Sequence, residues 1–313
     1  MRLIYLLCLL TIGGSCAAQT MTDGLMMNGG EFCVVAQYRH ESWQKYWEGG
    51  RLRENSLIGR ITTQSVTSMA AVGLCSRLNL IMSVPYIWTK ASKGTLSGQS
   101  GFQDFEAGLK FRLCQHQCGS DGRFSLFAVA GASMPVSNYV PDFMPLSIGV
   151  QSKTASLRAI ADYRVKGGAF VTLAAGYINR STIHIDRSTY YDDGKLYNSH
   201  EVRVPNMAEF TMRGGHISWR CTTDVYVQRQ QALKGSDIRR NDMPFPSNAM
   251  SQTRAGAQVI YRLPFLEPVS VQASAAYTFE GRNVGQTCEF VVGVRYVFSL
   301  WTCRNAKCDS DQK

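Results

Sequence analysis

The sequence predicts an all-β protein, a transmembrane antiparallel up-and-down β-barrel of about twelve strands. Amphipathic segments of roughly ten residues recur along the chain, and the links between them alternate between long polar loops and short turns. No segment is apolar over the ~20 residues that a spanning helix needs, since Thr172 and Gly176 interrupt the longest apolar stretch, Phe170 to Ile178. A secreted β-sandwich is the alternative fold, but it gives no reason for long and short links to alternate.

The start of the chain has the pattern of a secretory signal peptide. Arg2 supplies the positive charge, Leu3 to Ile12 the apolar region, and Ala18 ends a small-residue cleavage site. We therefore expect a signal peptide over residues 1–18 and a mature protein in the outer membrane of a Gram-negative bacterium. An acylated Cys16 stays open as an alternative, although no aliphatic residue stands three positions before it.

Composition favours one exported domain with no nucleic-acid partner. The 28 Gly, 14 Tyr and 14 Phe suit strands and tight turns. The net charge of +10 is scattered along the chain, without the block of Lys and Arg that marks a nucleic-acid arm. We divide the mature chain into an N-terminal periplasmic or plug segment at residues 19–30, the barrel at residues 31–301 and a polar periplasmic tail at residues 302–313.

Twelve segments carry the strand pattern, in which apolar and polar residues alternate. In the last one, Phe290, Val292 and Val294 take one face, and Glu289 and Arg295 the other. Residues 59–75 are also expected to form a strand, but their facing cannot be assigned from the pattern. The expected strands are residues 32–39, 59–75, 80–88, 104–113, 123–134, 151–165, 169–179, 202–213, 217–228, 251–262, 269–280 and 287–300.

The links between these segments predict which end of the barrel faces outward. Long polar links are expected on the outside, and short turns on the periplasmic side. The long links are residues 41–58, 91–100, 135–148, 181–199 and 233–248, followed by a shorter one at 281–286. The short turns are residues 76–78, 114–122, 166–168, 214–216 and 264–268.

Charged residues on the polar faces are the candidate pore lining, because an ionised group costs much less in a wet lumen than against lipid. They could form a charged constriction that orients solutes, or they could simply pair across strands and neutralise one another. The arginines outnumber the expected lumenal acids Asp162, Glu209, Asp224, Glu280 and Glu289, so an open lumen is expected to favour anions. The full candidate set is Asp104, Glu106, Lys110, Arg112, Arg158, Asp162, Arg164, Arg203, Glu209, Arg213, Arg220, Asp224, Arg254, Arg262 and Arg295.

Cysteines are numerous for an exported barrel, and the periplasm lets disulfides persist. Cys114 and Cys118 lie within one expected turn, so we expect them to be joined, and we expect the same of Cys303 and Cys308 in the tail. Metal binding by either pair is the weaker alternative, because neither has the spacing of a zinc site. The pairing of four other cysteines is left open: Cys33, Cys75, Cys221 and Cys288.

Catalysis and metal binding are the rival functions, and neither has a motif to support it. The five histidines fall in or beside links, and no nucleophile motif accompanies them. His184, Asp186, Asp192, Asp193 and His200 in the fourth long link could meet at a divalent ion, but a solvated loop explains them better. We therefore expect no cofactor, no metal and no enzymatic activity.

A family resemblance begins in the third strand. Residues 84–88, Val-Pro-Tyr-Ile-Trp, precede a Gly/Ser loop and then Gly101, Asp104, Lys110 and Arg112. In this the sequence resembles the outer-membrane family labelled as probable transporters of the meta-pathway of phenol degradation, which is distantly like the long-chain fatty-acid barrels. Phe102 and Gln103 depart from the family, which favours Leu and Gly there, and residues 131–135 and 145–149 resemble its next hairpin. The resemblance covers the middle third of the chain.

The resemblance implies a channel or transporter for small molecules, and the sequence as a whole leads to the same function. We expect the solutes to be hydrophobic or anionic, and the partners to be outer-membrane lipid, the solute and the barrel-insertion machinery. A non-conducting structural or adhesion barrel is the alternative, followed by an outer-membrane lipid hydrolase.

Overall fold

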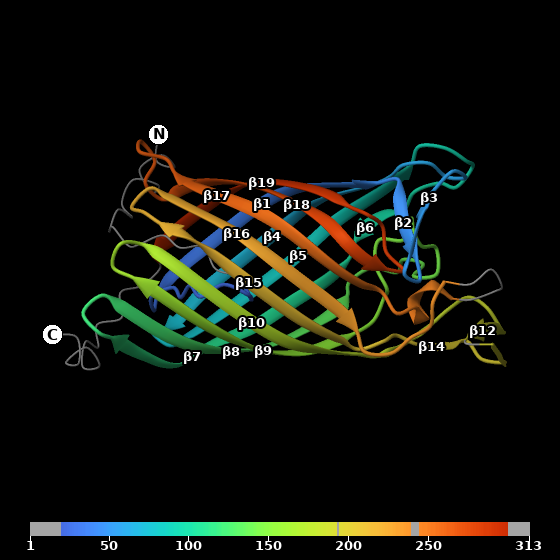
Figure 1. Cartoon of the computed structure of the whole chain (residues 1–313), viewed down its shortest axis with the longest axis horizontal. Coiled ribbons are helices and arrows are strands. Elements are labelled where there is room, and N and C mark those ends of the chain that lie inside the picture. Colours follow the sequence, from blue (N-terminus) through green and yellow to red (C-terminus); the bar gives the residue numbers. More distant parts are fainter. Residues whose placement is uncertain (1–19, 193, 239–243, 300–313) are drawn as a thin grey trace, which may run out of the picture.

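The computed structural model describes residues 20–192, 194–238 and 244–299, and these form a closed antiparallel β-barrel of twelve strands (Figure 1). Each strand pairs with its neighbours in sequence, and β1 closes the barrel by pairing with both β4 and β19. The predicted fold is confirmed. The barrel strands are β1 Glu31–Trp43, β4 Ile61–Cys75, β5 Leu78–Ala91, β7 Asp104–Cys118, β8 Gly122–Pro135, β9 Thr154–Val165, β10 Ala169–Arg180, β15 Met207–Ile217, β16 Cys221–Ala232, β17 Ser251–Arg262, β18 Val269–Arg282 and β19 Cys288–Ser299.

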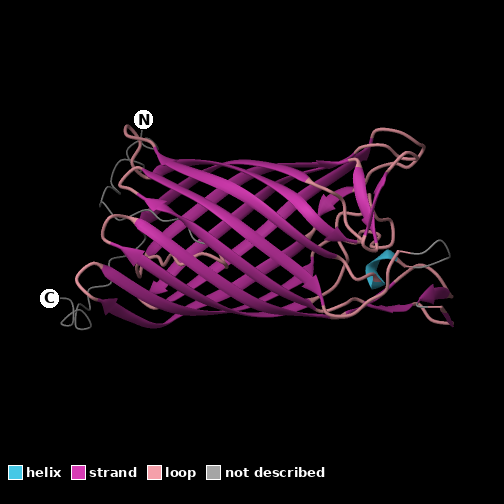
Figure 2. Cartoon of the chain, in the orientation of Figure 1, coloured by secondary structure: helices cyan, strands magenta, loops and turns pink. Residues whose placement is uncertain are grey.

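The long links gather at one end of the barrel, here called the loop end, and the short turns at the other, the turn end (Figure 2). This is the separation that the alternating link lengths predicted. None of the helices in the described residues is long and apolar enough to cross a membrane. The short elements at the loop end are β2 Lys45–Glu48, β3 Arg51–Glu54, β6 Ser100–Phe102, β11 Thr182–His184, β12 Tyr190–Asp192, β13 Lys195–Tyr197, β14 Glu201–Arg203 and the 3-10 helix η1 Phe245–Ser247.

Alternation along the strands separates an apolar outer face from a mostly polar lumen. On β19, Phe290 and Val292 are more than half exposed, whereas Glu289 and Arg295 are buried inside. The structure also assigns β4, whose facing the pattern left open: Ser65 is buried on the lumenal side and Val66 is exposed outside. A strand has a period of two, so the neighbours along each strand follow.

Several predicted strand boundaries are wrong, and the errors misplace side chains. Strand β7 continues to Cys118, so the turn before β8 is shorter than predicted. Residues 218–220 form the turn before β16, which removes Trp219 and Arg220 from the barrel wall. Barrel strand β15 starts only at Met207, because Val202 and Val204 are buried in a small apolar cluster of the loop end with Ile183 and Tyr190.

A β-bulge in β18 turns one predicted lumenal acid outward. Thr278 pairs with Arg254, but Glu280 pairs with Thr253, so Phe279 is an extra residue in the ladder. One extra residue reverses the facing of the residues that follow it. Glu280 therefore meets Arg229 on the outer face, at 2.8 Å between Oε2 and Nη1.

Residues 20–30, which we call the plug segment, lie inside the barrel. Met21 and Met27 are buried against lumenal side chains of the wall. The fit is tight: a Cβ on Gly73 of β4 would lie 1.9 Å from the Asn28 carbonyl oxygen. The sequence left a periplasmic or a plug location open, and the structure places the segment in the lumen. The wall residues around it are Cys33, Val35, Ala71, Ile81, Phe127, Val129, Ile160 and Ala174.

Candidate functional site

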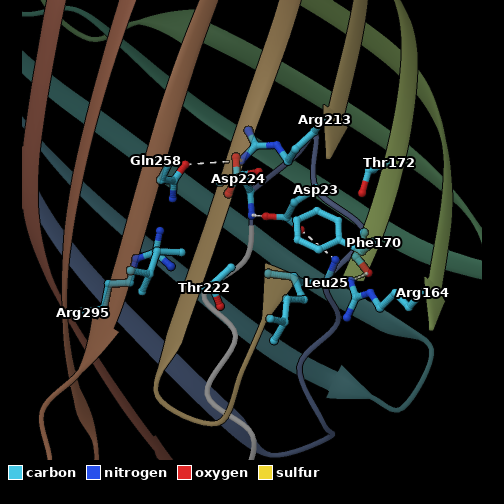
Figure 3. Close-up of a pocket in the computed structure, with 14 residues that line it drawn as sticks. Asp23, Leu25, Arg164, Phe170, Thr172, Arg213, Thr222, Asp224, Gln258 and Arg295 are labelled. Atoms are coloured by element: carbon cyan, nitrogen blue, oxygen red, sulfur yellow. Dashed lines mark hydrogen bonds and ion pairs between the residues drawn. The ribbon is translucent and has the colours of Figure 1, made fainter. Parts of the chain in front are cut away.

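Two cavities of very different size lie in the described part of the lumen. Toward the loop end it holds a cavity of about 530 Å³, here called the chamber, whose lining includes Arg39, Asp104, Glu106, Arg158, Arg180 and Glu209. Toward the turn end the plug segment leaves a pocket of only about 30 Å³, lined by Asp23, Arg164, Arg213, Asp224 and Arg295 among others (Figure 3). A pocket of that size holds about one water molecule.

Lys110 of β7 anchors the plug segment. Its ammonium is fully buried and lies 2.9 Å from Asp23 Oδ1, and it donates hydrogen bonds to the carbonyl oxygens of Thr20 and Asp23 at 3.2 and 2.5 Å. Burial by itself raises the pKa of the Asp23 carboxyl, but attraction and hydrogen bonding from Lys110 outweigh it and hold that pKa below its ordinary value. A buried charge pair of this kind is costly to break from one side.

Arg164 of β9 forms the second anchor. It donates from Nη2 to the Gly24 carbonyl at 2.7 Å and from Nε to Asp162 Oδ2 at 2.7 Å. Thr172 of β10 donates to the other Asp162 oxygen at 2.6 Å, so that this carboxylate is held from two strands. There is no room for a side chain at Gly24, where a Cβ would lie 2.1 Å from Asp162 Oδ1.

Two further arginines, Arg213 and Arg295, lie in the wall beside the plug segment (Figure 3). Arg213 Nη1 lies 2.8 Å from Asp224 Oδ1 on the neighbouring strand, and it also donates to Gln258. Arg295, which is buried, donates from Nε to Gln272 at 2.7 Å. The contact with Asp224 neutralises the Arg213 charge locally, whereas Gln272 only gives Arg295 a hydrogen-bond partner.

The link between β8 and β9 folds over the chamber at the loop end. Leu146 and Ile148 are buried, and the Leu146 carbonyl accepts a hydrogen bond from the Thr89 hydroxyl at 2.6 Å. The Tyr139 hydroxyl donates to Asp104 Oδ1 at 2.7 Å and accepts from the Gln151 backbone. This link therefore narrows the entrance to the chamber and brings a phenol to one of its acids.

Most of the predicted pore lining lies on the lumenal face, and four arginines do not line the interior as predicted. Arg203 is exposed on β14, outside the barrel wall, because the strand boundary there was misplaced. Arg220 in a turn and Arg262 at the end of β17 both lie over the Trp219 ring at 5.7 Å, at the rim of the turn end. Arg112 is also at this rim, where it donates to the Ser76 carbonyl and to Gln115.

The sequence analysis missed several charged residues that face the lumen. It therefore misjudged the balance of positive and negative charge there. Arg39 and Glu41 of β1 and Arg180 of β10 continue the same alternation into residues that the prediction treated as loops or left uncounted. Inside the barrel and away from its rims, eight described bases face eight described acids, so this set carries no excess of positive charge. The bases are Arg39, Lys110, Arg158, Arg164, Arg180, Arg213, Arg254 and Arg295, and the acids are Asp23, Glu41, Asp104, Glu106, Asp162, Glu209, Asp224 and Glu289.

The predicted disulfide between Cys114 and Cys118 is wrong. Both residues lie in β7, where four extended residues span about 13 Å, beyond the ~7 Å limit between bridged Cα atoms. Cys75, Cys221 and Cys288 are also free thiols in the structure. Cys303 and Cys308 lie outside the described residues. The structure brings together no group of three potential metal ligands among the residues it describes, and these include His184, Asp186, Asp192 and His200 of the fourth long link. Asp193 lies outside the described residues.

Comparison with solved structures shows the fold. The COG4313 outer membrane channel from Pseudomonas putida F1 is similar to this chain over 90% of the chain and 100% of the channel, with a TM-score of 0.70 and 15% identity. The translocator domain of the autotransporter NalP from Neisseria meningitidis matches at a TM-score of 0.45 and 13% identity, covering 87% of this chain and 90% of that domain. No family model and no curated protein matches the sequence. The chain therefore has the fold of an outer-membrane channel barrel, and the phenol-pathway family stays a prediction.

Proposed function

We propose that this protein is an outer-membrane channel or transporter for small molecules, and that its plug segment must move for a solute to pass. The loop end would face the outside of a Gram-negative cell, and the turn end the periplasm. The observation that carries the proposal is the asymmetric lumen, with a chamber of about 530 Å³ toward the loop end and a plug segment packed against the wall toward the turn end. A chamber of this volume has the size of a small-molecule site.

The lining of the chamber supports a polar rather than a hydrophobic solute. Glutamine, serine, threonine and paired charges make up most of it, and a few apolar side chains such as Met69 and Ile87 interrupt them. An apolar solute would leave these polar groups without water or a partner, which is unfavourable. The balance of lumenal charge likewise weakens the expectation of an anion channel.

The proposal assigns no catalytic residue. Neither lumenal cavity has a histidine or a cysteine in its described lining, and these are the side chains that most often activate a nucleophile. Lipid hydrolysis can be tested directly by assaying the purified barrel for release of fatty acid from phospholipid micelles, and we expect none above the rate of buffer alone.

Reconstitution tests the proposal. Purified protein in a planar bilayer should show mostly closed channels with brief openings, and removal of residues 20–30 should convert these into long openings. Liposomes containing the shortened protein should then swell in small uncharged solutes faster than liposomes containing the full chain. Failure of the shortened barrel to conduct would overturn the channel function.

A second candidate is the non-conducting structural or adhesion barrel, and one observation favours it. The buried anchor between Lys110 and Asp23 holds the plug segment firmly, and the loop end carries its own small sheets and apolar cluster. A barrel with this role would stay closed in the bilayer even when the anchor is removed. The conductance measurement therefore separates the two functions.

A further inference from the structure

The chamber contains charged side chains that form no ion pair within 4 Å with the described residues. Half of its six charged side chains form ion pairs: Arg158 with Glu209 at 3.1 Å, and Arg39 with Glu41 and Glu289. In the described part of the chain, neither Glu106 nor Arg180 has an ion-pair partner within 4 Å. Asp104, which is near them, accepts a hydrogen bond from Tyr139 and likewise has no basic partner at that distance. The chamber therefore offers two acids and one base to a ligand.

The unpaired acid and base stand at opposite ends of one cross-strand row. Glu106 of β7 pairs with Ser133 of β8, Ser133 with Thr154 of β9, and Thr154 with Arg180 of β10. All four side chains line the chamber, and the two hydroxyls lie 2.7 Å apart. Glu106 and Arg180 are three strand spacings apart, which is about 14 Å measured along the sheet. Because the barrel wall curves inward, the tips of the two side chains are closer together than their backbones.

Arg180 is prepared for an anion. Its Nε is buried and has no hydrogen-bond partner. A buried donor without a partner destabilises the empty site, and a carboxylate that accepts from it removes this cost. The guanidinium also matches a carboxylate in shape, since its planar fork can donate two parallel hydrogen bonds.

We propose that this row binds a small zwitterion, with its ammonium at Glu106 and Asp104 and its carboxylate at Arg180. Amino acids and short peptides are the chemical class that carries both groups on a small polar body, and the hydroxyls of Ser133 and Thr154 suit the amides between them. The proposal names the substrate class of the proposed channel, so it rests on the chamber being part of the solute path. Binding can nevertheless be measured without transport.

Three ligands with the same peptide backbone test whether the row from Glu106 to Arg180 binds a zwitterion. Glycylglycine carries both charges, N-acetylglycylglycine lacks the ammonium, and glycylglycinamide lacks the carboxylate. Each can be titrated against the full chain in detergent by saturation-transfer-difference NMR. We expect glycylglycine to bind about tenfold more tightly than either of the others, because each charge-assisted contact contributes roughly one order of magnitude.

Two neutral variants assign each end of the ligand. Arg180→Gln should lower the affinity for glycylglycine by about tenfold. It should change the affinity for glycylglycinamide by no more than about twofold, since that ligand has no carboxylate for Arg180 to bind. Glu106→Gln should lower the affinity for glycylglycine and leave the affinity for N-acetylglycylglycine unchanged, since the latter has no ammonium for Glu106 to bind. Arg123→Gln, an exposed arginine at the turn end of β8, is the matched control and should leave all three affinities unchanged.

The outcomes are distinct. Equal binding of the three ligands by the unmodified protein would overturn the proposal, whatever the variants do. Preference for glycylglycinamide over glycylglycine would show a cation site and overturn it as well. Channels that never conduct, in a protein that still prefers glycylglycine, would refute the transport function and leave the zwitterion site standing.

Discussion

Replacing Lys110 by methionine should release the plug segment. Methionine keeps most of the length and the apolar stem of the lysine, so the wall of β7 is retained. It removes the ammonium that lies 2.9 Å from Asp23 Oδ1 and that also holds the Thr20 and Asp23 carbonyls. The Asp23 carboxylate is then left buried without its opposite charge.

The size of the effect follows from the burial of this pair. Removing one member of a buried ion pair costs about 3–5 kcal/mol, because the other charge stays desolvated. At about 1.4 kcal/mol per factor of ten, the displaced state should gain two to three and a half orders of magnitude in population. We expect the lower end, an increase of about 100-fold in open probability, because the unpaired Asp23 carboxyl can take up a proton.

Single-channel recording in a planar bilayer measures this change. Lys110→Met should open far more often than the unmodified protein, while its heat-dependent gel mobility stays that of a folded barrel. The double variant Lys110→Met with Asp23→Leu should close again, because replacing both members of a buried pair by apolar residues is often nearly neutral. Unchanged open probability in a folded Lys110→Met barrel would show that the plug segment does not gate conduction.

Four further outcomes are expected. Gly24→Leu should also open the channel, because its side chain would collide with Asp162, and wild-type open probability in recordings of this variant would contradict the described packing. Open probability should stay constant between about pH 8 and pH 5 and rise only in stronger acid. The pKa of Asp23 is below its ordinary value of 3.8, so the ion pair with Lys110 is fully formed above pH 3.8 and is lost only as the pH falls through the lowered pKa. Cys114 and Cys118 should both be alkylated in the folded protein without reductant, and a bridged peptide in a non-reducing map would disprove their placement on one strand. Reversal potentials in a salt gradient should show weak ion selectivity that Arg254→Glu shifts toward cations, whereas Arg220→Glu at the rim should have no effect.

Strand periodicity and link length predicted the fold because both follow directly from the membrane. Every strand must show one face to lipid. The outer face of β19, with Phe290 and Val292, and its lumenal face, with Glu289, could therefore be assigned from the sequence alone, without knowing which residues contact each other. The same reasoning failed wherever the ladder is irregular. The bulge at Phe279 sends Glu280 outward, and alternation counted from the sequence has no means of detecting one extra residue.

Strand ends were the other source of error. The pattern of Val202 and Val204 is a good strand pattern, but these residues are buried in a cluster at the loop end rather than against lipid. Arg203 between them was therefore assigned to the lumen. The extension of β7 to Cys118 had no apolar signal, because residues beyond the membrane need no lipid-facing side chains.

The plug segment was hard to predict for a different reason. Its residues show no regular period, and glycine and asparagine within it are typical of loops. The available signals were Met21, Met26 and Met27, which are unusual in an exposed linker, and Asp23, which supplies the opposite charge for Lys110. Both signals depend on contacts across at least 80 residues of sequence, and no local pattern carries them.

The paired and the unpaired charges of this lumen lie in different places. Toward the turn end, each base of the plug anchors is paired or bonded to a carbonyl, as Lys110 is to Asp23 and Arg164 to Asp162, and in the proposed channel these contacts would hold the plug segment in place. In the chamber, by contrast, the described residues offer Glu106 and Arg180 no ion-pair partner within 4 Å. Paired charges contribute little to selectivity because their fields cancel at short range, whereas unpaired charges in a narrow polar space act on whatever enters. The solute preference of the barrel should thus be set by the few free charges of the chamber, and its resting state by the many paired charges below them.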